Sequence, residues 1–180
     1  MEYISYVVDN NLFDVRVADK KVTKLVELRK YWTGTYSWTH HGQQIAFLND
    51  SFEDKIEIIN ADGTDRQAIW VARPLTFSQS PRLNKILSYV EDISSAVSDY
   101  NITDYEKGIS FRLGKALATS VIYPGVGQSA VWSPDGNQIA FIPARAVCLS
   151  DSEAKNRRCL ESTAHVERLL GLAWQPNVNN

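Results

Sequence analysis

The feature that most constrains this fold is the segment 132–141, which reads Trp-Ser-Pro-Asp-Gly-Asn-Gln-Ile-Ala-Phe. Pro134 presets φ for the second position of a type I turn, Asp135 tolerates the bridge region, and Gly136 accepts a positive φ. Apolar residues flank these turn residues on both sides. The segment therefore predicts a tight β-hairpin.

Weaker copies of this hairpin recur along the chain. Its second strand begins at isoleucines that stand 41, 41 and 53 residues apart, namely Ile4, Ile45, Ile86 and Ile139. The aromatic residue before the turn recurs as Trp38, Phe77, Trp132 and Trp174. A period near 40 with four short strands per unit is typical of a β-propeller blade. The sequence therefore predicts an all-β fold, a β-propeller of four-stranded antiparallel blades with about four blades present.

The predicted propeller is a single domain over residues 1–180. Its blade units are 1–33, 34–72, 73–127 and 128–168, with an extra first strand in 169–177. Unit one lacks its first strand, and two interpretations follow. The chain is a fragment of a larger propeller, whose open sheet edges allow self-association. Alternatively, Leu170–Trp174 supplies the missing strand and closes a four-bladed ring.

The segment 132–141 resembles the TolB-like, WD-repeat-like β-propeller motif, in which an aromatic-Ser-Pro-Asp-Gly turn precedes a short Ile-Ala-Phe strand. The segment 58–63, Ile-Ile-Asn-Ala-Asp-Gly, is similar to the Asp-Gly hairpin of that family. The resemblance implies a stack of blades. Such propellers occur as binding modules in bacterial envelope proteins, and as the domain that gates prolyl-oligopeptidase-like serine peptidases. They usually have more blades than this chain offers.

Charge and hydropathy exclude several partners. The formal net charge is −2, so nothing points to nucleic acid. No run approaches the roughly 18 apolar residues of a membrane span. Met1 is followed directly by Glu2, which predicts no signal peptide. The location stays open: cytoplasmic, or periplasmic or extracellular if the chain is part of a longer exported protein.

Catalytic and metal-binding patterns are mostly missing. No Gly-x-Ser-x-Gly motif and no phosphate-binding Gly-rich loop occur. His40 and His41 replace Pro-Asp in a surface turn, and the aspartates at the other turns bond their own backbone; these are Asp62, Asp104 and Asp135. The sequence therefore predicts no enzyme activity, no cofactor and no metal. The alternative is the propeller portion of a serine peptidase or other hydrolase, with its catalytic domain outside this chain.

Cys148 and Cys159 occupy the last two predicted strands of unit four. If those strands pair around Glu153-Ala154, opposite residues have numbers that sum to 307, as these two do. Directly opposite residues lie within disulfide reach. The pair predicts either a disulfide, which favours an oxidising compartment, or two reduced cysteines.

The connections on one face of the propeller carry the candidate binding residues. Trp32 and Trp70 lie in the connections that lead to the first strand of the next unit, and the loops of that face add Tyr31, Phe52 and Tyr123. The same face would collect an acidic group, consisting of Asp50, Glu53, Asp54, Glu91 and Asp92. Aromatic loop residues are typical interface anchors. We therefore expect a non-catalytic module that binds a protein or peptide, unless these tryptophans only cover the blade ends.

Overall fold

The structure is a computed structural model of the whole chain. It describes residues 2–29, 35–39, 41–49, 53–71, 74–92, 97–116, 130–143, 146–160 and 172–174. The side chains at 91–92, 97–98 and 115–116 are not among those described.

The described residues form four antiparallel sheets, each a simple meander. Blade one contains β1 (Tyr3–Val8), β2 (Asn11–Arg16) and β3 (Val22–Glu27). Blade two contains β4 (Tyr36–Trp38), β5 (Gln44–Phe47), β6 (Lys55–Asn60) and β7 (Gln67–Trp70). Blade three contains β8 (Pro74–Gln79), β9 (Lys85–Asp92), β10 (Val97–Asp104) and β11 (Ile109–Ala116). Blade four contains β12 (Ala130–Trp132), β13 (Gln138–Phe141), β14 (Cys148–Asp151) and β15 (Arg158–Cys159).

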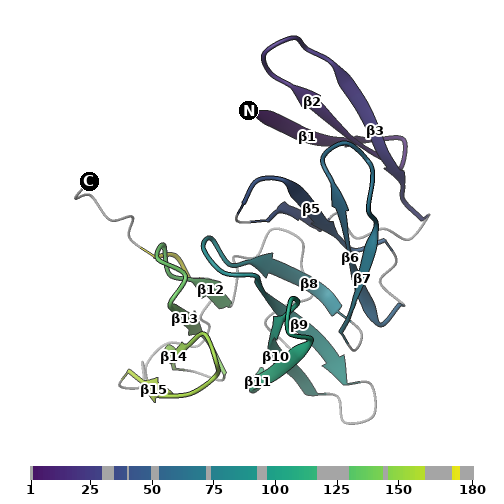
Figure 1. Cartoon of the computed structure of the whole chain (residues 1–180). Helices are drawn as coiled ribbons and strands as arrows, with labels where there is room; N and C mark the ends of the chain where they lie inside the picture. The colour runs from purple at the N-terminus through teal and green to yellow at the C-terminus, as the bar shows by residue number, and fades with distance from the viewer. Residues whose placement is uncertain are drawn as a thin grey trace.

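The four sheets follow one another around an arc, with blades one and four at its opposite ends (Figure 1). Blade one is three-stranded and lacks the strand that β4, β8 and β12 supply in the other blades. The predicted all-β fold of stacked antiparallel blades is confirmed. No helix occurs among the described residues, so none of them forms an apolar helix long enough to cross a membrane.

The hairpin turn is repeated in three blades with the same hydrogen bond. The backbone N–H of Ser133 donates to the carbonyl of Gln138, and Thr39 and Ser80 make the equivalent bond, each with a length of 2.9 Å. Gly136 has φ of 71°, as the sequence predicts for this turn. The repeated bond fixes the register of the first two strands in each blade.

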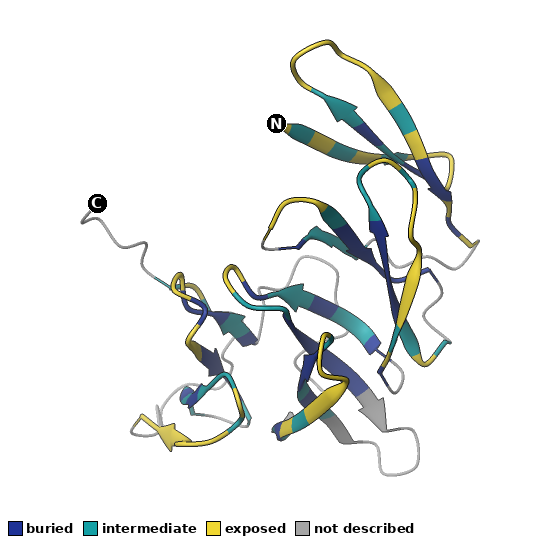
Figure 2. Cartoon of the chain, viewed as in Figure 1, coloured by how far each residue is buried: buried dark blue, intermediate teal, exposed yellow. Residues whose placement is uncertain are grey.

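The core lies between neighbouring blades, where alternate residues of one sheet pack against the next sheet (Figure 2). Leu12 and Leu25 of blade one pack with Ile45 and Phe47 of blade two. The next two junctions are built alike, from the groups Ile56, Ile58, Phe77 and Ile86, and Tyr100, Ile102, Ile139 and Phe141. Each blade is therefore stabilised by its neighbours along the sequence.

Blade three differs from the predicted repeat. Trp38 and Trp132 lie opposite Ile45 and Ile139, but the residue opposite Ile86 is Gln79. Phe77, which the aromatic spacing assigned to this position, lies two residues earlier, opposite Ser88, and is buried. Strand β8 also shifts register between Pro74 and Thr76.

The described residues of the predicted insertion at 91–98 lie in strands. β9 continues to Asp92 and β10 begins at Val97, so the hairpin is lengthened and residues 93–96 fall outside the described part. Of the second insertion, Gly114 to Ala116 extend β11, and residues 117–128 also lie outside it.

Candidate interaction surface

Trp70 is the one predicted binding aromatic that falls among the described residues. Tyr31, Trp32, Phe52 and Tyr123 all lie outside them. The structure therefore places one member of the predicted set and says nothing of the others. Of the acidic group, only the side chains of Glu53 and Asp54 are described.

Trp70 is the last residue of β7, whereas the sequence had placed it in the connection after that strand. It pairs with Lys55 of β6. Its neighbour Ile69 packs against the core between blades two and three. Because side chains alternate along a strand, Trp70 points to the other face of the sheet, together with Lys55. Trp70 is 75% exposed.

A chain of ion pairs runs beside Trp70 and links blades one and two. Arg29, just after β3, contacts Glu53 at 2.7 Å. Lys55 contacts both Glu53 and Glu57 at 3.0 Å. Arg66 donates from Nε to Glu57 at 2.8 Å and lies over the ring of Phe47. These five charged residues, Arg29, Glu53, Lys55, Glu57 and Arg66, are called the charged rim below.

The charged rim stabilises the ammonium form of Lys55. Hydrogen bonds to Glu53 and then to Glu57 raise the pKa of Lys55 above its usual value. Glu53, predicted as part of an acidic surface, is paired with two cations. The described part of this face therefore offers an exposed indole beside alternating charges, and not an acidic patch.

The predicted turn aspartates have backbone partners. Asp135 accepts hydrogen bonds from the Ser133 hydroxyl at 2.6 Å and the Asn137 N–H at 3.1 Å, and these lower its pKa. Asp62 and Asp104 accept backbone bonds from Thr64 and Lys107. Among the described residues, no three His, Cys, Asp or Glu side chains lie close enough to hold a metal ion. His41 is exposed in its turn, and His40 falls outside the described residues.

Cys148 of β14 lies directly opposite Cys159 of β15. Their Cα atoms are 3.9 Å apart and their sulfurs are bonded. The next pair, Leu149 and Arg158, follows the same register. The disulfide ties the short outermost strand of blade four to a buried neighbour, since Cys148 has no exposed surface.

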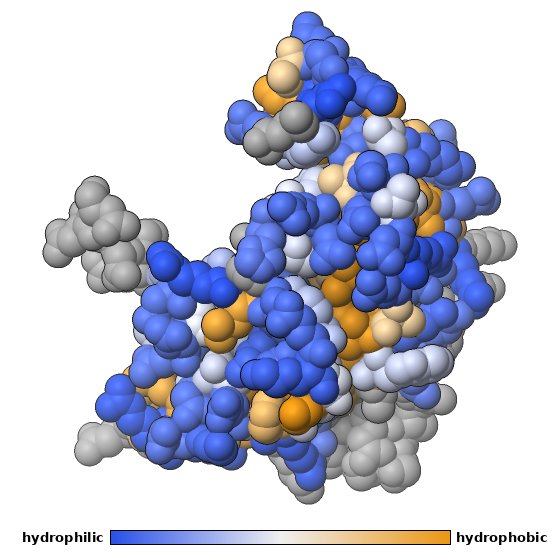
Figure 3. Space-filling view, viewed as in Figure 1, coloured by the Kyte–Doolittle hydropathy of each residue, from blue (hydrophilic) through white to orange (hydrophobic). Residues whose placement is uncertain are grey.

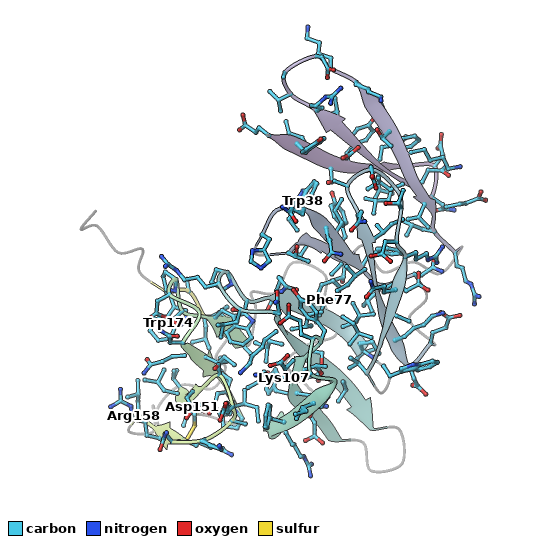
Figure 4. All side chains as sticks on the ribbon, viewed as in Figure 1. Trp38, Phe77, Lys107, Asp151, Arg158 and Trp174 are labelled. Atoms are coloured by element: carbon cyan, nitrogen blue, oxygen red, sulfur yellow. A yellow bond between two sulfur atoms is a disulfide. The ribbon has the colours of Figure 1, made fainter. Side chains whose placement is uncertain are left out.

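Two tryptophans make a repeated contact that sequence reasoning did not find. The indole Nε1 of Trp132 donates to the carbonyl of Ser78 at 3.3 Å. The indole of Trp174, labelled in Figure 4, donates to the carbonyl of Val131 at 3.2 Å. Ser78 and Val131 each precede the position opposite the isoleucine in their own blade. The matching repeat positions of the tryptophans predict packing between blades, but they do not identify these acceptors.

Comparison with known proteins supports the fold and no more. No protein-family model matches the chain, and no curated protein is detectably similar to it in sequence. Solved structures do match. TolB from Acinetobacter baumannii has a TM-score of 0.56 at 14% identity, over 89% of this chain and 40% of that chain. A chain of the mitotic checkpoint complex has a TM-score of 0.55 at 16% identity, over 87% of this chain and 47% of that chain.

Dipeptidyl peptidase 4 from Porphyromonas gingivalis matches with a TM-score of 0.51 at 16% identity, over 77% of this chain and 22% of that chain. The chain spans less than half the length of each of these three chains. These proteins differ in what they do. What they share with this chain is its architecture: the chain is a partial β-propeller of about four blades, similar to TolB-like and WD-repeat propellers.

Proposed function

We propose that this chain is a non-catalytic propeller module that binds a protein or peptide through the surface around Trp70. The observation that carries the proposal is the indole of Trp70, which is 75% exposed at the end of β7. An exposed tryptophan supplies a large apolar contact area at little cost in conformational entropy, and tryptophan is enriched among residues that dominate binding energy.

The charged rim supports a protein partner over a small apolar ligand. Its side chains are held by one another, so they present a fixed pattern of positive and negative groups next to the indole. A polar border around an aromatic anchor is the usual anatomy of a protein interface. This pattern of charge would select which proteins bind to the surface.

Affinity capture tests the proposal. The whole chain is immobilised and the proteins retained from an extract of the source organism are compared for wild type and Trp70→Ala. We expect Trp70→Ala to weaken capture of a specific partner at least about tenfold, as loss of an interface anchor does. Ile109→Ala is the matched control, because Ile109 is also exposed but lies on blade three. Equal losses of partner capture in both variants, or no loss of capture in Trp70→Ala, would contradict the proposal.

The alternative function is a propeller that serves a hydrolase. The match to dipeptidyl peptidase 4 favours it, because a propeller accompanies a peptidase in that protein. Reading the gene on both sides of the segment that encodes this chain distinguishes the two. A peptidase or hydrolase domain in the same reading frame would favour the alternative.

A further inference from the structure

Strand β7 forms the outer edge of blade two, which has all four strands and packs against a blade on each side. The N–H of Val71 donates to the carbonyl of Asp54, and this bond sets the alternation of the ladder between β6 and β7. By that alternation Ile69 bonds toward β6, so the N–H and C=O groups of Ala68 and Trp70 point away from the sheet. No described residue pairs with these outward groups.

The other described outer strands carry features that oppose pairing with a further strand. In β3, Leu25 is an extra residue in the ladder, and Lys24 and Glu27 are charged. In β11, Leu113 is the extra residue, and Arg112 beside it is charged. Strand β15 has only two residues. Bulges, charged side chains and very short strands are the usual protections of a sheet edge.

Strand β7 has none of these bulges or charges. Its four residues, Gln67 to Trp70, are all neutral, and its ladder with β6 runs without a register shift. Three of the four residues are exposed (Figure 2). Among the described outer strands, β7 therefore offers the most regular edge for one more strand.

The side chains on one face of β7 suit an apolar residue of such a strand. Ala68 and Trp70 share the face that carries their partners Glu57 and Lys55. Ala68 is small and exposed, and Trp70, two residues further along, is 75% exposed. A large apolar side chain opposite Ala68 would therefore have room and would lie diagonal to Trp70, within reach of its ring. Figure 3 shows apolar patches over blades two and three within a surface that is otherwise mostly hydrophilic.

We propose that an extended segment of another protein adds to β7 as a fifth, antiparallel strand of blade two. The inference rests on the proposed function and specifies the partner of that surface as an extended peptide segment. Up to four backbone hydrogen bonds join the segment to Ala68 and Trp70, and an apolar side chain opposite Ala68 packs on the indole. In this mode of recognition the backbone bonds supply affinity and the side chains select the sequence.

A second copy of this chain fits the edge less well than a peptide segment does. It would bring its own β7 and so pair four residues on each side, whereas a stable interface uses about 20–30 residues a side. An extended segment can continue beyond the strand and follow the charged rim beside Trp70. Light scattering should therefore give the mass of a single chain. A double mass that falls to a single chain in Ala68→Pro would overturn the proposal in favour of pairing between copies.

Peptide selection and one proline substitution test the added strand. A library of random seven-residue peptides is selected on the immobilised whole chain, and the tightest binder is the probe. Ala68→Pro removes one outward N–H and leaves the ladder to β6 intact, because proline is tolerated where the N–H of an edge strand faces solvent. We expect Ala68→Pro and Trp70→Ala each to weaken binding of the probe at least about tenfold.

Ser110→Pro is the matched control on blade three. Ser110 is the second residue of β11, as Ala68 is of β7. Because the N–H of Tyr105 donates to the carbonyl of Asn84 in β9, the alternation directs the N–H of Ser110 outward as well. Ser110→Pro should leave binding of the probe unchanged, and thermal unfolding checks that each variant is folded.

The outcomes separate this inference from the proposed function. A loss of binding in Trp70→Ala without a loss in Ala68→Pro would overturn the added strand and leave the surface around Trp70 standing. No loss in Trp70→Ala would contradict the proposed function as well. A library that yields no binder, or equal losses in Ala68→Pro and Ser110→Pro, would overturn the added strand.

N-methylation of the probe gives a readout that needs no variant of the protein. Successive amides of a strand point to opposite edges, so methylating alternate residues removes donors from one edge only. One alternate set should weaken binding at least about tenfold, and the other set should change it less than about twofold. Equal effects of the two sets would show that the peptide does not bind as a strand.

Discussion

The indole of Trp132 donates a hydrogen bond to the backbone carbonyl of Ser78, across the junction between blades three and four. The ring itself is buried in the core of that junction. Trp132 therefore holds two sheets together both by apolar packing and by one directional bond.

Replacing Trp132 by Phe should destabilise the fold by about 1–2 kcal/mol, because the change removes the donor to Ser78 and part of a buried ring. Urea unfolding followed by circular dichroism measures the effect. Trp70→Phe is the matched control and should change the free energy of unfolding by less than about 0.5 kcal/mol, since Trp70 is exposed. Equal effects in the two variants would mean that the interblade bond contributes nothing.

Reducing the Cys148–Cys159 bridge should lower the free energy of unfolding by about 3 kcal/mol, from the chain entropy of a loop this short. The comparison is urea unfolding with and without reductant, after mass spectrometry has established that the air-purified protein contains the bridge. The variant Cys148→Ala/Cys159→Ala should not respond to reductant. Free thiols in the purified wild type would show that the pair is reduced.

Asp14 should make the protein less stable as the pH rises from acid toward neutral. Burial raises the pKa of its carboxyl above the usual 3.8, against smaller lowering effects of the Thr23 hydroxyl and Arg16. Because the folded state then holds the proton more tightly than the unfolded chain, this stability is present below pH 3.8 and is lost as the pH rises through the raised pKa.

The variant Asp14→Asn isolates that effect, since the amide has nearly the same shape and no charge. Its free energy of unfolding should exceed that of the wild type at neutral pH, and the difference should shrink as the pH falls below 3.8. Urea unfolding at a series of pH values gives both curves. A difference that stays constant with pH would show that the Asp14 carboxyl titrates alike in the folded and unfolded states.

Gly136→Ala should lower the free energy of unfolding more than Gly42→Ala does. Both glycines have a positive φ, 71° and 64°, so each substitution carries a backbone penalty of about 1–2 kcal/mol. At Gly136 the new Cβ would also meet the Ser80 hydroxyl at 3.0 Å and Arg82 Cβ at 3.2 Å, whereas Gly42 faces open space. Thermal unfolding should therefore show that Gly136→Ala lowers the free energy of unfolding by at least about 1 kcal/mol more than Gly42→Ala does.

The repeat was predictable where turn chemistry and strand pattern agreed. The hairpins around Trp38 and Trp132 fold in the expected register, and the opposition of Cys148 and Cys159 followed from counting residues across one turn. Blade three was misaligned because its buried aromatic, Phe77, stands two residues before the repeat position, which Gln79 occupies. A register shift inside β8 leaves no simple mark in residue spacing.

The candidate surface was less predictable than the fold. Trp70 was singled out from sequence, but its place within β7 depends on where a strand ends, which periodicity fixes poorly. The charged rim joins Arg29 of blade one to residues of blade two, and such pairing depends on how two sheets stack. No local sequence pattern shows which residues of two stacked sheets will form ion pairs.

Among the described residues, blade one packs against blade two alone, while blades two and three each pack against two neighbours. In a linear array of this kind, the terminal unit is held by half as many junctions, so it is the first to unravel on warming or on mild denaturation. Amide hydrogens of β1 and β2 in an isolated single copy would then exchange with solvent ahead of those in β9 and β10. Amide protection that rises from blade one toward blade three would show how far the stability of each blade depends on the blades packed against it.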